Sequence, residues 1–214
     1  MNGLLVWLLA AAITTWLPQP VAAQDTTRNW NFSVYLDDKP IGYHRFELRQ
    51  QGERSELRST ARFDVKVLFI NAYQYVHDDS ESWQGDCLQS MTASTDDNGK
   101  QLSVKAAKQG DEIGVTNREH HYALPGCVMS FAYWNPLMLQ QTRLLNAQTG
   151  EYDAVTIKFV GEVTLQVRGV SQMAKQYRLT GNKLSIDLWY SSSGDWLALQ
   201  STTESGRRLR YVLS

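Results

Sequence analysis

The stretch WNFSVYLD, residues 30–37, alternates apolar side chains with more polar ones, and IGYHRFELRQ, residues 41–50, resumes the alternation after a turn at Lys39 and Pro40. A period of two is that of a β-strand, whose successive side chains point to opposite faces of a sheet. Two such stretches joined by a short turn predict an antiparallel hairpin. Its buried face is expected to hold Trp30, Phe32, Val34, Leu36, Ile41, His44, Phe46 and Leu48.

The same alternation recurs along almost the whole chain, and turns such as Asn98-Gly99 and Gly194-Asp195 interrupt it. Short turns between strands favour an antiparallel meander over strand–helix–strand units. We therefore expect a mainly β fold, a curved antiparallel sheet forming an open or half barrel of about 11–13 strands, in a single domain over residues 24–214. The expected strands are 30–37, 41–50, 54–68, 72–83, 87–94, 101–107, 112–118, 152–160, 163–170, 174–179, 183–190, 196–203 and 208–213.

One segment departs from the strand pattern. Asn135-Pro136 places a capping residue before a proline at the first helical position, and leucine and methionine follow without β-branched residues. This pattern predicts one main helix over residues 136–147, lying across the open face of the sheet.

The N-terminus has the composition of a secretory signal peptide. Residues 4–17 form an uncharged, largely apolar run, Pro18 and Pro20 interrupt it, and Val21-Ala22-Ala23 provides the small residues of a cleavage site. The run is shorter than the roughly 20 residues that span a bilayer core. We expect a cleaved signal peptide at residues 1–23 and a periplasmic location, with no transmembrane segment after cleavage; an uncleaved anchor is the alternative.

Cys87 and Cys127 are the chain's two cysteines. In an oxidising compartment such a pair favours a disulfide. Two buried thiols or a reactive cysteine are the alternatives, and neither cysteine lies in a CxxC motif.

Charge and motifs exclude several classes of function. The chain has 21 basic and 22 acidic residues, a balance without the basic excess of nucleic-acid-binding proteins. It has no GxSxG, SxxK, Walker or GxGxxG motif, so we expect no cofactor and no nucleotide. The arginines at 207, 208 and 210 are expected on an edge strand, where basic residues hinder sheet-to-sheet association.

Two sets of polar residues are candidates for a metal-binding or catalytic site. His120 and His121 are adjacent, so in a strand they point to opposite faces, and no metal site is expected. Asp78, Asp79, Glu81 and Asp86 form an acidic set for which a solvated outer face is expected. Carboxylate catalysis is the alternative reading, and it requires two carboxylates across a cleft.

Aromatic residues are the most informative candidates for function. They bury large apolar areas and can also line a ligand cavity. Either core packing or ligand contact accounts for them. If a cavity lies between the sheet and the 136–147 helix, its lining is expected to be Tyr73, Tyr75, Trp83, Tyr133, Trp134, Met138 and Leu139.

Three segments resemble a family of exported bacterial proteins, the domain-of-unknown-function family 6134. They are WNFSVYLDDKPIGYHRFEL at 30–48, YWNPLMLQQTRLLNAQTGE at 133–151 and IDLWYSSSGDWLALQSTTESGRRLRYVL at 186–213. The resemblance implies no activity and no catalytic residue. In outline the chain is also similar to LolA-like periplasmic carriers, in which an open antiparallel barrel curls over helices and shelters acyl chains; this is an analogy of fold.

Three functions follow as hypotheses. The first is a non-enzymatic periplasmic protein that binds a lipid, an acyl group or another apolar small molecule. The second is a module that binds another envelope protein through an exposed edge or patch. The third is an enzyme without a recognisable motif, which requires His120 or His121 within hydrogen-bond reach of Asp79 or Glu81.

Overall fold

The computed structural model describes residues 25–67, 70–182, 184–203 and 205–214, so the expected signal peptide lies outside the described part of the chain. One antiparallel sheet of 14 strands makes up most of the structure. No helix within the described ranges is long and apolar enough to cross a membrane. The strands are β1 Thr26–Leu36, β2 Lys39–Gln51, β3 Arg54–Val67, β4 Ile70–Gln84, β5 Cys87–Asp97, β6 Lys100–Gln109, β7 Glu112–Thr116, β8 His121–Pro125, β9 Arg143–Leu145, β10 Tyr152–Val167, β11 Val170–Gly181, β12 Leu184–Tyr190, β13 Trp196–Thr202 and β14 Arg208–Leu213.

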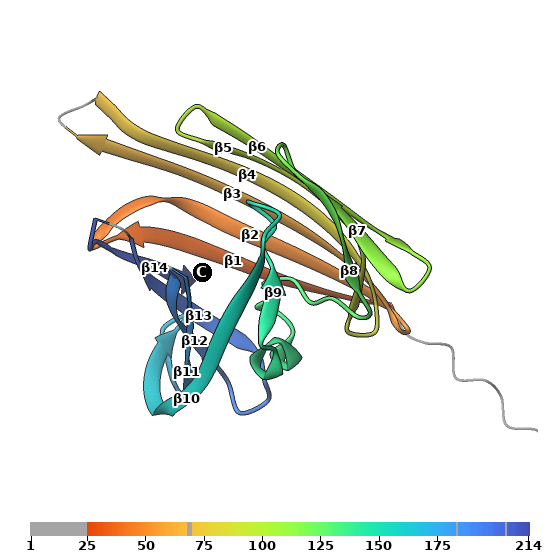
Figure 1. Ribbon diagram of the computed structural model, residues 1–214. Coiled ribbons are helices and arrows are strands. Elements are labelled where there is room, and N and C mark those ends of the chain that lie inside the picture. The colour runs from red at the N-terminus through yellow and green to blue at the C-terminus, as the bar shows by residue number, and fades with distance from the viewer. Residues whose placement is uncertain (1–24, 68–69, 183, 204) are drawn as a thin grey trace, which may run out of the picture.

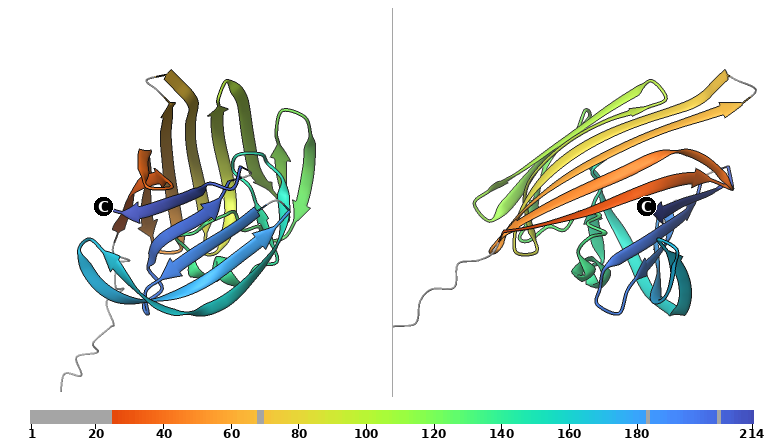
Figure 2. Two further views of the ribbon diagram at one scale, coloured as in Figure 1. Left: turned by 90° about the vertical axis from the view of Figure 1, so that its left-hand side faces the viewer. Right: turned by 180° about the vertical axis from the view of Figure 1, so that it is seen from behind.

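The order of strands follows the chain, except that the first and last strands pair with each other. In this β1–β14 ladder Val34 lies opposite Tyr211. The sheet therefore consists of two arms, β1–β8 and β9–β14, which meet at the β1–β14 seam, and β8 and β9 are its two edges. The arms face each other in Figure 1, and Figure 2 shows their strands curling around a common interior.

The predicted alternation is confirmed where it is clearest. Trp30, Phe32, Val34 and Leu36 of β1 are buried, and less buried residues separate them. The register shifts at β-bulges, among them Val34/Tyr35. Because a bulge bends its strand and increases the local twist, these shifts help a long sheet to curve around its apolar face.

The chain between the edge strands β8 and β9, residues 126–142, closes one end of the interior, and we call it the connection. Its residue Cys127 forms a disulfide with Cys87 at the start of β5, which confirms the predicted pair. The Leu88 amide donates to the Val128 carbonyl at 3.0 Å, and the Leu145 amide of β9 donates to the Met129 carbonyl at 2.9 Å. One short segment is thus hydrogen-bonded to both arms.

The predicted helix over 136–147 is wrong. Only Pro136–Gln140 is helical, as a single 3-10 turn, although Asn135 caps it as expected by accepting a hydrogen bond from the Leu137 amide. Gln141 is already extended, and Arg143–Leu145 pairs with β10. Leu144 and Leu145 are both fully buried, one on each side of this short edge strand, so the leucine spacing that resembles a helix reflects a strand buried on two faces.

The expected 11–13 strands are also too few. β10 is one strand over Tyr152–Val167, bulged between Phe159 and Gly161, where the sequence predicts two strands separated at the glycine. The short edge strands β8 and β9 lack enough residues to show a period. The helices that the LolA-like analogy implies are represented, in the described residues, by the one 3-10 turn.

Aromatic packing fills the closed end and ties the arms together. The rings of Trp83 and Trp134 pack edge to face at 5.5 Å between centroids. Trp196 of β13 packs against Phe32 and Phe46 of the other arm, at 4.4 and 5.1 Å. Because such rings bury much apolar surface, this end of the interior is solid core, and open space remains further along the strands.

Candidate functional site

Two adjoining hollows lie between the two arms of the sheet. The outer one, the opening, has a volume of about 710 Å³, and the inner cavity has about 250 Å³. His44, Tyr75 and Gln148 line both, so the two hollows adjoin at these side chains, where the Tyr75 hydroxyl donates to the Gln148 side chain at 2.9 Å. The lining comes from strands of both arms and from the connection between them.

The opening has apolar walls and a polar rim. Its apolar wall includes Leu36, Ile41, Phe63, Val65 and Leu209. At the rim, the Tyr73 hydroxyl donates to Asp97 at 2.6 Å, and in the wall the Phe63 and Tyr75 rings stack at 5.2 Å. An apolar wall with a few fixed polar groups is typical of a small-molecule site.

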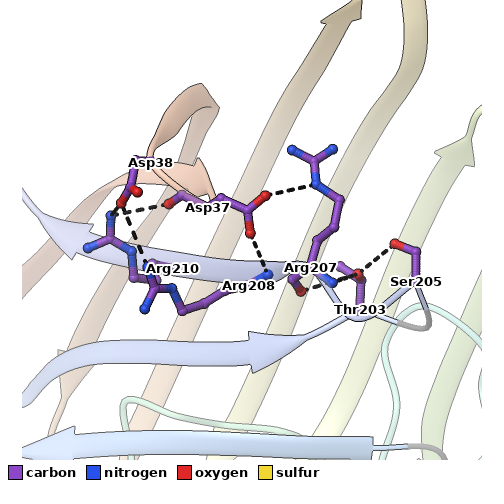
Figure 3. A network of polar contacts seen from close by, with 7 residues as sticks. All are labelled: Asp37, Asp38, Thr203, Ser205, Arg207, Arg208 and Arg210. Carbon is purple, nitrogen blue, oxygen red and sulfur yellow. Dashed lines mark hydrogen bonds and ion pairs between the residues drawn. The ribbon is translucent and has the colours of Figure 1, made fainter.

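An ionic network holds the rim on the seam side (Figure 3). Asp37 accepts hydrogen bonds from the Arg207 guanidinium and the Arg208 amide, both at 3.0 Å, and Arg210 donates to Asp38. These contacts hold the pKa of Asp37 below its usual value, through the Arg208 amide first and the Arg207 side chain second. The expectation that these arginines decorate an edge strand is wrong, because β14 is an inner strand and they join the β1–β2 turn to the β13–β14 turn.

The inner cavity carries a polar band among its apolar side chains. Successive inward positions of β4 supply His77, Asp79 and Glu81. In the same sheet, β2 supplies His44 and β3 supplies Ser59, while the connection supplies Ser130. The strand period explains the grouping, because alternate residues of β4 share one face.

The expectation of a solvated outer face is therefore wrong for two of the four acidic residues. Asp79 and Glu81 are 6% and 5% exposed and line the inner cavity. Asp78 points outward and pairs with Arg62 at 2.8 Å, and Asp86 accepts a hydrogen bond from Asn135. The strand period explains the difference, since residue 78 falls between the inward positions 77 and 79, and Asp86 lies beyond the end of β4.

Burial favours the protonated form of the two inward carboxyl groups. It raises the pKa of Glu81 to about 7, although hydrogen bonds from Ser130 and Trp83 oppose the rise; the Trp83 indole donates at 3.0 Å. Burial, and then repulsion from Glu81, raises the pKa of Asp79 well above its usual range. Asp79 Oδ1 is buried and has no hydrogen-bond partner in the described part of the chain. The pair thus offers an unsatisfied acceptor and a readily displaced proton.

The two histidines of the inner cavity are uncharged near neutral pH. Burial lowers the pKa of His77 to about 4 and that of His44 well below its ordinary value, with repulsion between the two histidines adding to the fall for His44. His77 Nδ1 lies 2.8 Å from the Thr95 hydroxyl, and His44 Nε2 lies 2.7 Å from the Ser59 hydroxyl. His44 Nδ1 faces the Tyr211 hydroxyl at 3.3 Å, where a catalytic triad would have a carboxylate.

The predicted ligand-lining residues divide into two groups. Tyr73 and Tyr75 line the opening, and Tyr75, Tyr133 and Trp134 line the inner cavity. The other three pack in or against the core, Trp83 and Met138 fully buried and Leu139 partly buried. The inner cavity is bounded by residues 130–134 of the connection instead of by a helix.

His120 and His121 are not part of this site. Both are exposed, and His121 Nδ1 lies 2.8 Å from the Thr116 hydroxyl. The enzyme hypothesis in the form that required either of them beside Asp79 or Glu81 is therefore wrong. The described residues contain no group of three His, Cys, Asp or Glu side chains placed to hold a metal ion.

Several lining residues escaped sequence reasoning. His44, Ser59, Ser130 and Gln148 come from four separate segments, and only the fold brings them together. A signal for the acidic pair was present, because Asp79 and Glu81 share the β4 face of Tyr75 and Trp83. Acidic residues in register with inward aromatic ones indicate a buried polar site.

Comparisons with known proteins agree with this fold. A crystal structure described as a beta-barrel-like protein of domain of unknown function DUF1849 from Brucella abortus superposes with a TM-score of 0.63 and 10% sequence identity, over 91% of this chain and 98% of that one. At this identity the likeness concerns the fold alone. No curated protein matches the chain. The profile of the domain of unknown function DUF6134 matches residues 32–214, and the chain therefore belongs to the DUF6134 family.

Proposed function

We propose that this protein binds an elongated apolar small molecule, such as a lipid or an acyl chain, in the opening and the inner cavity. The observation that carries the proposal is a 710 Å³ hollow with apolar walls that adjoins a smaller polar cavity at His44, Tyr75 and Gln148. Ligand sites typically measure about 300–1,000 Å³ and combine apolar walls with a few convergent polar groups. Burial of apolar ligand surface, at roughly 25 cal/mol per Å², supplies the affinity.

We further propose a periplasmic location. The apolar run before residue 18 has signal-peptide character, and the Cys87–Cys127 disulfide fits an oxidising compartment. A protein in that compartment lies between membranes that contain lipids and other apolar molecules.

Filling the opening tests the proposed function. Val65 lines the opening, whereas its neighbour Asp64 is exposed on the other face of β3. We expect the uncharged dye N-phenyl-1-naphthylamine to bind the protein with increased fluorescence. Val65→Trp should weaken binding at least tenfold, because the indole occupies the apolar space, and Asp64→Trp should leave it unchanged. Absence of dye binding, or equal affinity for the two variants, would refute the proposal.

A second candidate function is contact with an envelope protein, and exposed apolar side chains on one hairpin favour it. On β10 and β11, Phe159 and Met173 are 56% and 55% exposed and share one face, because Met173 is four residues from Tyr177, the cross-strand partner of Phe159. Apolar side chains exposed on one face favour a protein contact.

Photo-crosslinking in intact cells tests this second candidate. A benzoylphenylalanine at position 173 should form an adduct with another protein, which the same group at exposed Lys108 of the other arm should not form. Identical adduct patterns from the two positions, or no adduct from either, would count against it.

A further inference from the structure

The inner cavity contains two carboxyl groups without a positively charged partner among the described residues. Two of its lining residues, Asp79 and Glu81, are carboxylic acids, and its lining contains neither lysine nor arginine in the described structure. Buried carboxylates are normally paired with a cation or fully hydrogen-bonded. Here Trp83 satisfies one oxygen of Glu81, but Asp79 Oδ1 is left buried without a partner.

The aromatic residues of the cavity wall also favour a positively charged ligand. Five aromatic side chains line the cavity, and the π faces of such rings attract cations. They are Phe46, Tyr75, Phe131, Tyr133 and Trp134. A cavity that combines aromatic rings with an unpaired, buried carboxyl oxygen is complementary to a compact organic cation.

We infer that the inner cavity binds a protonated amine, which forms one end of the apolar ligand whose remainder lies in the opening. The inference rests on the proposed function and specifies its ligand class. The ammonium group donates to Asp79 Oδ1 and lies against the aromatic rings, while the apolar part contacts residues such as Phe63 and Val65.

Other ligand ends fit less well. A carboxylate or phosphate would meet two carboxyl groups, with two histidines that are uncharged near neutral pH as its nearest basic groups. A hydroxyl donates one hydrogen bond but brings no charge to balance a carboxylate. A quaternary ammonium has the charge but no N–H for the unsatisfied oxygen.

The site predicts a pH dependence. The titratable groups that face it are Asp79, Glu81, His77 and Tyr75 of β4, His44 of β2, Tyr133 of the connection and Tyr211 of β14. The tyrosines have raised pKa values and the histidines lowered ones, so all stay uncharged between pH 6 and 8. Glu81, with its pKa raised to about 7, loses its proton in this range, and affinity for an ammonium should therefore rise with pH.

Calorimetry with three ligands of one chain length tests the inference. At pH 8, decylamine should bind the full chain at least tenfold more tightly than decanol, and decanoic acid more weakly than either. Lowering the pH to 5.5 should reduce the preference for decylamine over decanol severalfold. Decanol is the internal reference because it shares the chain and lacks the charge.

Two variants test whether Asp79 and Glu81 cause the preference for decylamine over decanol. Asp79→Asn and, separately, Glu81→Gln should bring the ratio of decanol to decylamine dissociation constants close to one. Asp78→Asn, the outward neighbour on β4, is the matched control and should keep the wild-type ratio. Thermal unfolding of each variant checks that it is folded, and the pH series on the wild type tests the inference without a variant.

The outcomes separate this inference from the proposed function. If the wild type binds decanol and N-phenyl-1-naphthylamine but shows no preference for decylamine, the amine inference fails and the proposed function stands. A preference that persists in both Asp79→Asn and Glu81→Gln would also overturn the inference. If neither the dye nor any of the decyl compounds binds, both proposals fail.

Discussion

Replacing Cys87 and Cys127 together with alanine should lower the free energy of unfolding by about 4 kcal/mol. The bond joins residues 40 apart, so its removal frees a long loop in the unfolded chain. In the folded protein the same loop contains β5–β8 and ends in the connection that closes the interior. Urea unfolding of the variant and of the wild type measures the change.

The matched control is the wild type with its disulfide reduced, which should unfold at the same urea concentration as the double variant. The effect should extend to the site, because Ser130, Tyr133 and Trp134 lie a few residues beyond Cys127 and line the inner cavity. Affinity for N-phenyl-1-naphthylamine should therefore fall on reduction. A loss below about 1 kcal/mol would mean that the loop is already restricted in the unfolded state.

Sequence reasoning succeeded where the evidence was local and periodic. The alternation in residues 30–36 and 41–50 depends only on strand geometry, and the structure has these residues in β1 and β2. The disulfide followed from an even cysteine pair and an expected oxidising compartment. The cap at Asn135 was also local, and it is present.

Sequence reasoning failed where contacts between distant segments determine the local structure. Leu144 and Leu145 have helix-like spacing with their neighbours, but pairing with β10 and burial on both sides hold them in a strand. Asp79 was assigned to solvent because charged residues are usually exposed, a rule that fails at sites where function or pairing offsets the desolvation cost. No sequence pattern joins His44 to Ser130, since their proximity depends on the connection crossing from one edge of the sheet to the other.

Glu81→Gln should remove a loss of stability that occurs as the pH rises from acidic to neutral. The folded state binds the Glu81 proton more tightly than the unfolded chain, with a pKa of about 7 against 4.5. The contribution of Glu81 to the free energy of unfolding should therefore decrease as the pH rises from about 4.5 to about 7, by up to about 3 kcal/mol. Glutamine never ionises, and its amide oxygen can still accept from the Trp83 indole.

His77 gives the opposite dependence over an overlapping pH range. It has a folded pKa of about 4 against 6.5, so the unfolded chain binds its proton first and stability falls as the pH drops below about 6.5. In the wild type the two effects therefore oppose each other between about pH 4.5 and 6.5. Urea unfolding between pH 4.5 and 8.5 should show the free energy of unfolding of Glu81→Gln rising relative to that of the wild type up to about pH 7, because only the histidine dependence is left, and Asp78→Asn should follow the wild type. Parallel curves for Glu81→Gln and the wild type above pH 5 would show that Glu81 is already ionised at little cost, and an ionised Glu81 would remove the reason for the amine affinity to increase with pH.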